Sequence, residues 1–233
     1  MADQLLIAVP SKGRLMNDTL ARFAQAGLEI TRIGSERGYF GKIESLDTAE
    51  VQFASASEIA GHLRHGRVHF GVTGQDLVHE NIPAFHRDVE FICPLGFGHA
   101  DLIVAVPDWW LDVRTVSQLE EVGRQFRATH GRRMRVATKY LNTARRFFAS
   151  AGLSTYRLVE SLGATEATPA AGTAELIVDI TTTGNTLRAN NLRMLDDGVI
   201  LRSQANLVAS NTADWSGDVA SARALVLERF QAL

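Results

Sequence analysis

The sequence predicts an α/β protein with parallel or mixed β-sheets. Short apolar runs such as residues 5–9 alternate with amphipathic segments along the chain, which is the pattern of repeated strand-helix units. Gly- and Pro-containing turns separate these segments, and no internal repeat or low-complexity linker is present. A chain of 233 residues is long enough for one large domain or two small ones.

The composition narrows the class of protein. A formal net charge of -2 provides no basic field for a nucleic acid, and no apolar run approaches the length of a membrane span. The single cysteine, Cys93, excludes an internal disulfide and fits a reducing compartment. The amino terminus lacks the basic start and long apolar core of a signal peptide. We therefore expect a cytoplasmic protein that contacts neither nucleic acid nor membrane.

The first strand-helix unit carries two cations. Residues 5–9 read as a buried strand, residues 10–14 as a turn, and the following helix runs to about Ala26 before Gly27. Ligands of open α/β sheets bind at the carboxyl ends of strands, where Lys12, Gly13 and Arg14 lie. Phosphate binding and an ordinary solvated turn are both consistent with this pattern.

A second strand-to-turn-to-helix unit follows. Residues 28–53 contain short alternating runs, and a helix with an N-cap signal starts at Ser55 and ends at Gly66. Residues 68–72 then form a strand that leads into Thr73, Gly74 and Asp76. This turn is a second candidate anion site, although Asp76 also suits the first turn of a helix. The histidines near it, which are His62, His65 and His69, are expected to be packed or solvated side chains and not metal ligands.

The middle of the chain continues the alternation. We expect strands at 89–95, 100–106, 134–138 and 153–159, and helices at 116–130 and 142–151. Lys139 and Tyr140 follow one of these strands directly. After the central strand we expect one long strand at 199–208 and a closing amphipathic helix at 215–233.

The most informative stretch is residues 174–191. The apolar run 176–178 stops at Asp179, and a turn of small hydroxyl residues leads into a helix. Free backbone N–H groups, hydroxyl donors and a glycine without Cβ make such a turn suitable for a phosphate, while Asp179 can accept hydrogen bonds from sugar hydroxyls. The alternative is an ordinary capped turn. The candidate phosphate ligands are Thr182, Thr183, Gly184, Asn185 and Thr186.

Five sequence motifs besides this loop resemble one known family. In chain order they are PSKGRL, FGVTGQDLV, LGFGHADLIVAVP, VATKYLNTARRFF and ESLGATEATPAAGTAELIVD, and DITTTGNTLRANN closes the series. Together they resemble ATP phosphoribosyltransferase, the glycosyltransferase of the first step of histidine biosynthesis. The resemblance extends over nearly the whole chain.

The resemblance implies a two-lobed fold of the periplasmic-binding-protein type (type II), with mixed sheets and an active-site cleft between the lobes. It places residues 1–97 and 188–233 in a discontinuous first lobe and residues 98–187 in the second. It further implies that ATP reacts with 5-phosphoribosyl diphosphate to give N1-(5-phosphoribosyl)-ATP and diphosphate. A cytoplasmic, nucleotide-binding enzyme of amino-acid biosynthesis is expected.

The resemblance also assigns roles to individual residues. Lys12, Arg14 and Arg37 are expected to stabilise the diphosphate. Glu166, Asp179 and residues 182–186, called the threonine loop below, are expected to bind 5-phosphoribosyl diphosphate. The nucleotide is expected near Lys12, Gly13, Arg14, Thr73, Gly74 and Asp76. Mg²⁺ is the implied cofactor, held through the diphosphate of the substrate. Because adenine N1 is not acidic in ATP, no strong general base is required.

Two positions depart from the family pattern, since Ser55 stands where many relatives have a basic residue and Leu141 where they usually have proline. The chain resembles the short form, whose members act with a regulatory subunit similar to histidyl-tRNA synthetase, and we expect a homodimer within such a hetero-oligomer. Two alternatives remain: a non-catalytic ligand-binding protein of the same fold, and another phosphoribosyltransferase. Other phosphoribosyltransferases usually have two adjacent acids before the threonines of their phosphate loop, whereas here Ile180 follows Asp179.

Overall fold

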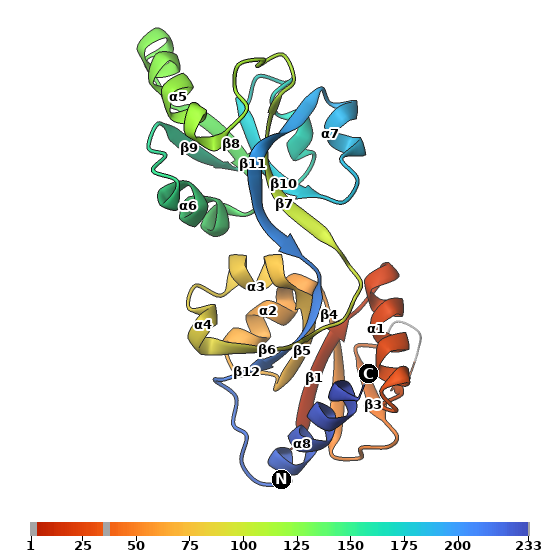
Figure 1. The fold of residues 1–233 in the computed structure, drawn as a ribbon. Coiled ribbons are helices and arrows are strands. Elements are labelled where there is room, and N and C mark those ends of the chain that lie inside the picture. The colour runs from red at the N-terminus through yellow and green to blue at the C-terminus, as the bar shows by residue number, and fades with distance from the viewer. Residues whose placement is uncertain (1–3, 35–37, 233) are drawn as a thin grey trace. The chain divides into compact units, whose positions relative to one another are not determined.

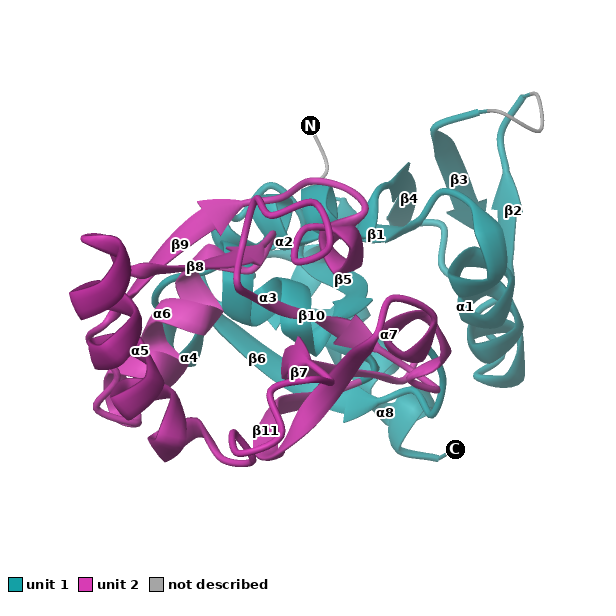
Figure 2. Ribbon diagram, turned by 90° about the horizontal axis from the view of Figure 1, so that it is seen from above, with its two compact units in different colours: residues 1–98, 204–233 teal, residues 99–203 magenta. Residues whose placement is uncertain are grey.

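The computed structural model describes residues 4–34 and 38–232. The chain forms two compact units, one from Met1–Gly98 with Gln204–Leu233 and one from His99–Ser203 (Figure 2). It passes from the first unit to the second after Gly98 and returns after Ser203. Residues 188–203, which the sequence analysis assigned to the first lobe, thus belong to the second unit in this division.

The first unit is a seven-stranded mixed sheet with helices on both faces (Figure 1). The strand order is β2-β3-β4-β1-β5-β12-β6, in which β1 runs parallel to β4 and β5, and β12 runs antiparallel to β5 and β6. Its elements are β1 (Leu5–Pro10), α1 (Gly13–Gln25), β2 (Ile30–Arg32), β3 (Phe40–Ile43), β4 (Ala49–Ala54), α2 (Ala56–Arg64), β5 (Phe70–Gly74), α3 (Gln75–Asn81), α4 (Phe85–Asp88), β6 (Val89–Pro94), β12 (Ala205–Ser210) and α8 (Asp218–Gln231).

Alternation along the strands sends side chains to two separate cores in this unit. On one face, Ile7 and Val9 pack with Phe23 of α1 and Phe230 of α8, whose rings meet edge to face at 5.0 Å between centroids. On the other face, Ala8 packs with side chains of α2 and α3. A strand buried on both faces needs a continuous apolar run, which is why residues 5–9 are detectable from the sequence.

The second unit is a five-stranded sheet in the order β11-β7-β10-β8-β9. The central strand β10 is antiparallel to β7 and parallel to β8. The elements are β7 (Ala100–Pro107), α5 (Val116–His130), β8 (Met134–Thr138), α6 (Leu141–Ser150), β9 (Tyr156–Glu160), a 3₁₀ turn (Thr165–Ala167), β10 (Leu176–Thr181), α7 (Asn185–Ala189) and β11 (Leu192–Ser203).

The faces of this second sheet are also distinct. Ile177, Ile103 and Ala137 form a core with Leu187 of α7. Met134 lies on the opposite face, where its methyl group is close to Gly123 of α5. Asp179 is two residues after Ile177 on β10, so it shares the face that α7 covers.

One of the expected strands is divided in the structure. Residues 199–208, read as one long strand, belong to two strands that end and begin on either side of Gln204. β11 pairs with β7 in the second unit, whereas β12 pairs with β5 and β6 in the first. The change of sheet at Gln204 therefore lies within a stretch that reads as one strand in the sequence. In the described part of the chain, every helix is too short or too polar to cross a membrane.

Candidate functional site

The loop between β10 and α7 has the features expected of a phosphate-binding turn. Gly184 adopts a left-handed backbone with φ 70°, and its N–H donates to Thr181 Oγ1 at 3.0 Å. The N–H of Asn185 donates to Thr183 Oγ1 at 3.4 Å. A hydroxyl that accepts a backbone N–H keeps its own proton, so both threonines can still donate to an anion. Thr182 and Thr186 are exposed.

A cation that the sequence analysis did not single out lies beside this loop. Arg188, one helical turn after Gly184, donates to the carbonyl of Thr183 at 3.2 Å and closely contacts Asn185 Oδ1. A Cβ on Gly184 would lie 3.1 Å from Arg188 Nη1. The sequence could have revealed Arg188 through its spacing of four residues from Gly184, because residues i and i+4 are neighbours on a helix.

The negative charge of Asp179 is unfavourable in its surroundings. Burial raises the pKa of its carboxyl group, and nearby Glu166 raises it further, while the N–H of Ile180, at 2.8 Å, and the charge of Lys139 act in the opposite direction. Glu166 lies in the 3₁₀ turn and Lys139 directly follows β8. The structure thus brings Asp179, Glu166 and the threonine loop together at the carboxyl end of β10.

The first unit places Lys12 at the carboxyl end of β1. Lys12 is the exposed N-cap residue of α1, and Gly13 follows with φ 71°. Arg14 is 93% exposed and pairs with Asp18 at 3.4 Å, one turn along the same helix. Such an exposed ion pair is weak, so Arg14 can exchange Asp18 for another anion. Arg37 lies outside the described residues.

A pocket of about 470 Å³ adjoins this turn. Ser55 faces it as the N-cap of α2 and forms a capping box with Glu58, so it fills a structural role where a basic residue was expected. Among the described residues, none is a hydrogen-bond partner for the buried Nδ1 of His62. The lining residues are Ser11, Lys12, Tyr39, Gln52, Phe53, Ala54, Ser55, Glu58 and His62.

Arg32 supports this pocket from β2 and was missed by the sequence analysis. Its guanidinium group lies 3.8 Å from the centre of the Phe53 ring and donates to the carbonyls of Ser11 and Gly38, both at 2.9 Å. It therefore links the β1–α1 turn to the neighbouring strands. No local pattern marks this role, since these partners are 6 to 21 residues away in the sequence.

The β5–α3 turn lies beside the Lys12 turn, because β5 is parallel to β1. Gly74 is the N-cap of α3 and Asp76 is buried in its first turn. The Thr73 hydroxyl is buried and donates to the carbonyl of Ala56 at 2.7 Å, so it anchors the start of α2. Its expected contact with a nucleotide stays a prediction.

The described residues include no group of three or more His, Cys, Asp or Glu side chains that could hold a metal ion. The carboxylates of Asp179 and Glu166 are close enough to affect each other electrostatically. Two carboxylates beside a phosphate-type loop fit a divalent metal ion that takes its other ligands from substrate and water.

The fold and these two clusters define an α/β protein of two units, one with a basic turn and the other with a sugar-phosphate type of loop. The family model described as "HisG: ATP phosphoribosyltransferase" matches residues 55–231. A curated ATP phosphoribosyltransferase of Rhodopseudomonas palustris (strain BisA53) is 58% identical over 98% of this chain and 70% of its own length. The chain belongs to the ATP phosphoribosyltransferase family, which confirms the expected family and enzyme class.

Solved structures support the expected fold. The ATP phosphoribosyl transferase (HisG:HisZ) complex from Thermotoga maritima matches with a TM-score of 0.72 at 23% identity, over 98% of this chain and 97% of the matched one. A histidine kinase sensor domain with similarity to periplasmic binding proteins matches with a TM-score of 0.55 at 14% identity, over 100% and 90%. The periplasmic-binding-protein-like architecture is thereby confirmed.

Proposed function

We propose that this chain is an ATP phosphoribosyltransferase that joins ATP and 5-phosphoribosyl 1-diphosphate. In the reaction, adenine N1 attacks C1 of the ribose and the bond from C1 to the diphosphate breaks, so that N1-(5-phosphoribosyl)-ATP and diphosphate are released. The observation that carries this proposal is the 58% identity to a protein of that name over 98% of the chain. The reaction belongs to histidine biosynthesis, and we place the protein in the cytoplasm.

The β10–α7 loop is the proposed site for the 5-phosphate. The left-handed Gly184 lets the backbone approach the phosphate, and Thr182, Thr183, Asn185 and Thr186 supply donors around it. Arg188, next to Thr183, adds a positive charge at the same place.

Asp179 and Glu166 are the proposed ligands of the ribose. A buried carboxylate whose pKa is raised gains most from hydrogen-bond donors. Ribose hydroxyls are such donors, so substrate binding compensates an unfavourable charge at Asp179.

The basic turn of the first unit is the proposed site for the diphosphate and nucleotide. Lys12 and Arg14 are exposed at the carboxyl end of β1, and Gly13 leaves the backbone between them open to a ligand. Fixed cations stabilise the charge that grows on a departing diphosphate. Arg37 is retained in this role, with Gly74 and Asp76 of the next turn for the nucleotide.

A metal ion completes the proposed chemistry. Family membership supports the use of a metal ion, and its identity as Mg²⁺ is part of this proposal. When bound to the diphosphate, the ion neutralises the charge of the leaving group.

We further propose that the chain assembles as a homodimer with a separate regulatory subunit. The Thermotoga maritima structure is a HisG:HisZ complex by its description, and its HisG-like fold matches this chain. Size measurements of the chain alone and mixed with a candidate regulatory subunit test this assembly. If the regulatory subunit mediates inhibition by histidine, the isolated chain should lack it. An isolated chain that is fully active and directly inhibited by histidine therefore contradicts the proposed assembly.

The function is tested by incubating the chain, alone and with its partner, with ATP, 5-phosphoribosyl diphosphate and Mg²⁺ while the absorbance of phosphoribosyl-ATP is followed. Gly184→Val is expected to lower kcat/KM by about 100-fold or more, because displacement of a binding loop by about 1 Å has effects of this size. Gly152→Val is the matched control, since Gly152 also has a positive φ of 73° and lies in the same unit. Equal losses in both variants contradict the assignment of the loop.

A further inference from the structure

Four arginines gather where β8 and β9 begin. Arg132 and Arg133 precede β8, Arg135 is its second residue, and Arg157 is the second residue of β9. Arg135 and Arg157 are direct partners in the parallel ladder. Like charges placed opposite each other on neighbouring strands oppose folding. The fold alone does not require this arrangement.

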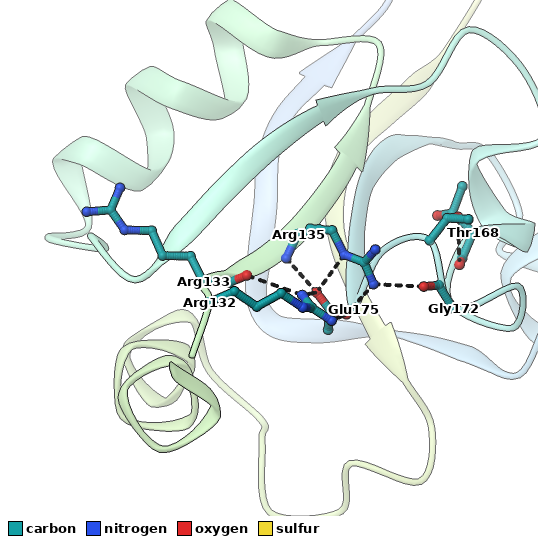
Figure 3. A network of polar contacts seen from close by, with 7 residues as sticks. Arg132, Arg133, Arg135, Thr168, Gly172 and Glu175 are labelled. Carbon is teal, nitrogen blue, oxygen red and sulfur yellow. Dashed lines mark hydrogen bonds and ion pairs between the residues drawn. The ribbon is translucent and has the colours of Figure 1, made fainter. Parts of the chain in front are cut away.

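A single carboxylate compensates part of this charge. Glu175 accepts from Arg132 at 3.0 and 3.1 Å and from the Arg135 side chain at 2.8 and 3.3 Å, and it also accepts the N–H of Arg135 at 2.6 Å. Figure 3 shows Arg132 and Arg135 turned toward Glu175, whereas Arg133 extends away from it. With five donors, Glu175 has no capacity left for further arginines.

The other two arginines have no acidic partner among the described residues. Arg133 and Arg157 are exposed, and neither takes part in an ion pair with any residue that the structure describes. Four guanidinium groups against one carboxylate leave three positive charges. The five residues Arg132, Arg133, Arg135, Tyr156 and Arg157 line one cavity of about 290 Å³.

This arginine cavity is separate from the candidate site of the same unit. Its residues lie at the amino ends of β8 and β9, whereas Lys139 follows the carboxyl end of β8 and Asp179 lies near that of β10. Because β8 and β10 are parallel, the two places are at opposite edges of the sheet. A ligand of the arginine cavity thus leaves the threonine loop open.

We propose that the arginine cavity binds a small phosphate-bearing anion with two or more negative charges. Guanidinium groups hold phosphate oxygens through paired hydrogen bonds, and several of them together favour a multiply charged anion. The size of the site favours a small molecule, because a stable protein interface covers about 800 Å² on each partner. Inorganic pyrophosphate has the required charge and size and serves as the probe.

The test is a titration of the full chain with inorganic pyrophosphate, without divalent metal, followed by amide signals in nuclear magnetic resonance. Residue-resolved signals separate this cavity from the threonine loop. The backbone signals of residues 132–135 and 156–157 are expected to shift until saturation. In the variant R133A/R157A the dissociation constant reported by the remaining signals is expected to rise at least tenfold.

The matched control is R64A/R67A, which removes two exposed arginines from the first unit and changes the net charge equally. Its affinity at residues 132–135 is expected to stay within twofold of the unchanged chain. Circular dichroism verifies that each variant is folded. The proposal is overturned if pyrophosphate does not shift these signals, or if both double variants weaken binding to the same extent. In the first case, an acidic protein surface replaces the small anion as the proposed occupant.

Discussion

Replacing Glu175 by glutamine tests whether its arginine partners contribute to stability. Burial of the carboxyl group acts to raise its pKa, but the hydrogen bonds from Arg132 and Arg135 outweigh burial and lower the pKa from 4.5 to about 2. Glutamine has nearly the same shape but no charge, and it can accept only part of the five hydrogen bonds. The variant E175Q is therefore expected to be less stable at neutral pH.

The pKa difference sets the size of this effect. At about 1.36 kcal/mol per pKa unit, the change from 4.5 to about 2 corresponds to about 3.4 kcal/mol. The side chains of Arg132 and Arg135 are 44% and 29% exposed, so solvent screening reduces the contribution, and we expect about 1.5 kcal/mol at pH 7. Since the folded pKa is the lower one, this stability is present above about pH 5 and is lost toward pH 2.

The assay is urea unfolding of the two proteins at pH 7 and at pH 3.5. Roughly two fifths of the difference is expected to disappear at the lower pH, because the unfolded carboxyl group is then mostly protonated. Glu121→Gln is the control, since Glu121 pairs with Arg124 on an exposed helix surface and its replacement is expected to leave the stability nearly unchanged. A difference for E175Q that is independent of pH refutes this electrostatic account.

Three further predictions concern packing and the candidate site. Gly123→Ala would place a Cβ 2.0 Å from Thr155 Oγ1, so we expect a loss of about 2 kcal/mol in urea unfolding, and an unchanged midpoint contradicts this packing. Asp179→Asn is expected to abolish binding of 5-phosphoribosyl diphosphate in calorimetry. Because burial raises the pKa of Asp179, its charge opposes folding above that pKa, and the same variant should be at least as stable as the unchanged chain at pH 7. Arg32→Lys removes the paired hydrogen bonds to the carbonyls of Ser11 and Gly38. We expect kcat/KM to fall about tenfold or more because kcat falls. An unchanged kcat excludes a positioning role for Arg32.

Locally encoded elements were predictable to the residue. The expected helix 116–130 and strand 134–138 have the bounds found for α5 and β8. Gly131 explains this agreement, because its left-handed φ of 65° ends the helix at a position that the sequence marks. The closing helix begins at Asp218 and not at Trp215, whose ring instead packs against Phe70 and His69. A tertiary contact decided that boundary.

The candidate site was predictable only where its residues are close in sequence. The threonine loop is one continuous segment, so its composition reveals it. Arg32 acts through Ser11, 21 residues away, so no local pattern reveals its role. Such roles arise from the strand order of the sheet, which local patterns do not specify.

Glu175 and Asp179 show why burial alone does not reveal function. Glu175 directly precedes β10 and Asp179 lies near its carboxyl end, so both acids belong to one short segment of the chain. The structure surrounds Glu175 with guanidinium groups that lower its pKa to about 2, so this charge stabilises the fold. Asp179 is buried near another acid, its pKa is raised, and its charge opposes folding. In the proposed site, the hydroxyl groups of a ribose are the donors that would offset this unfavourable charge of Asp179.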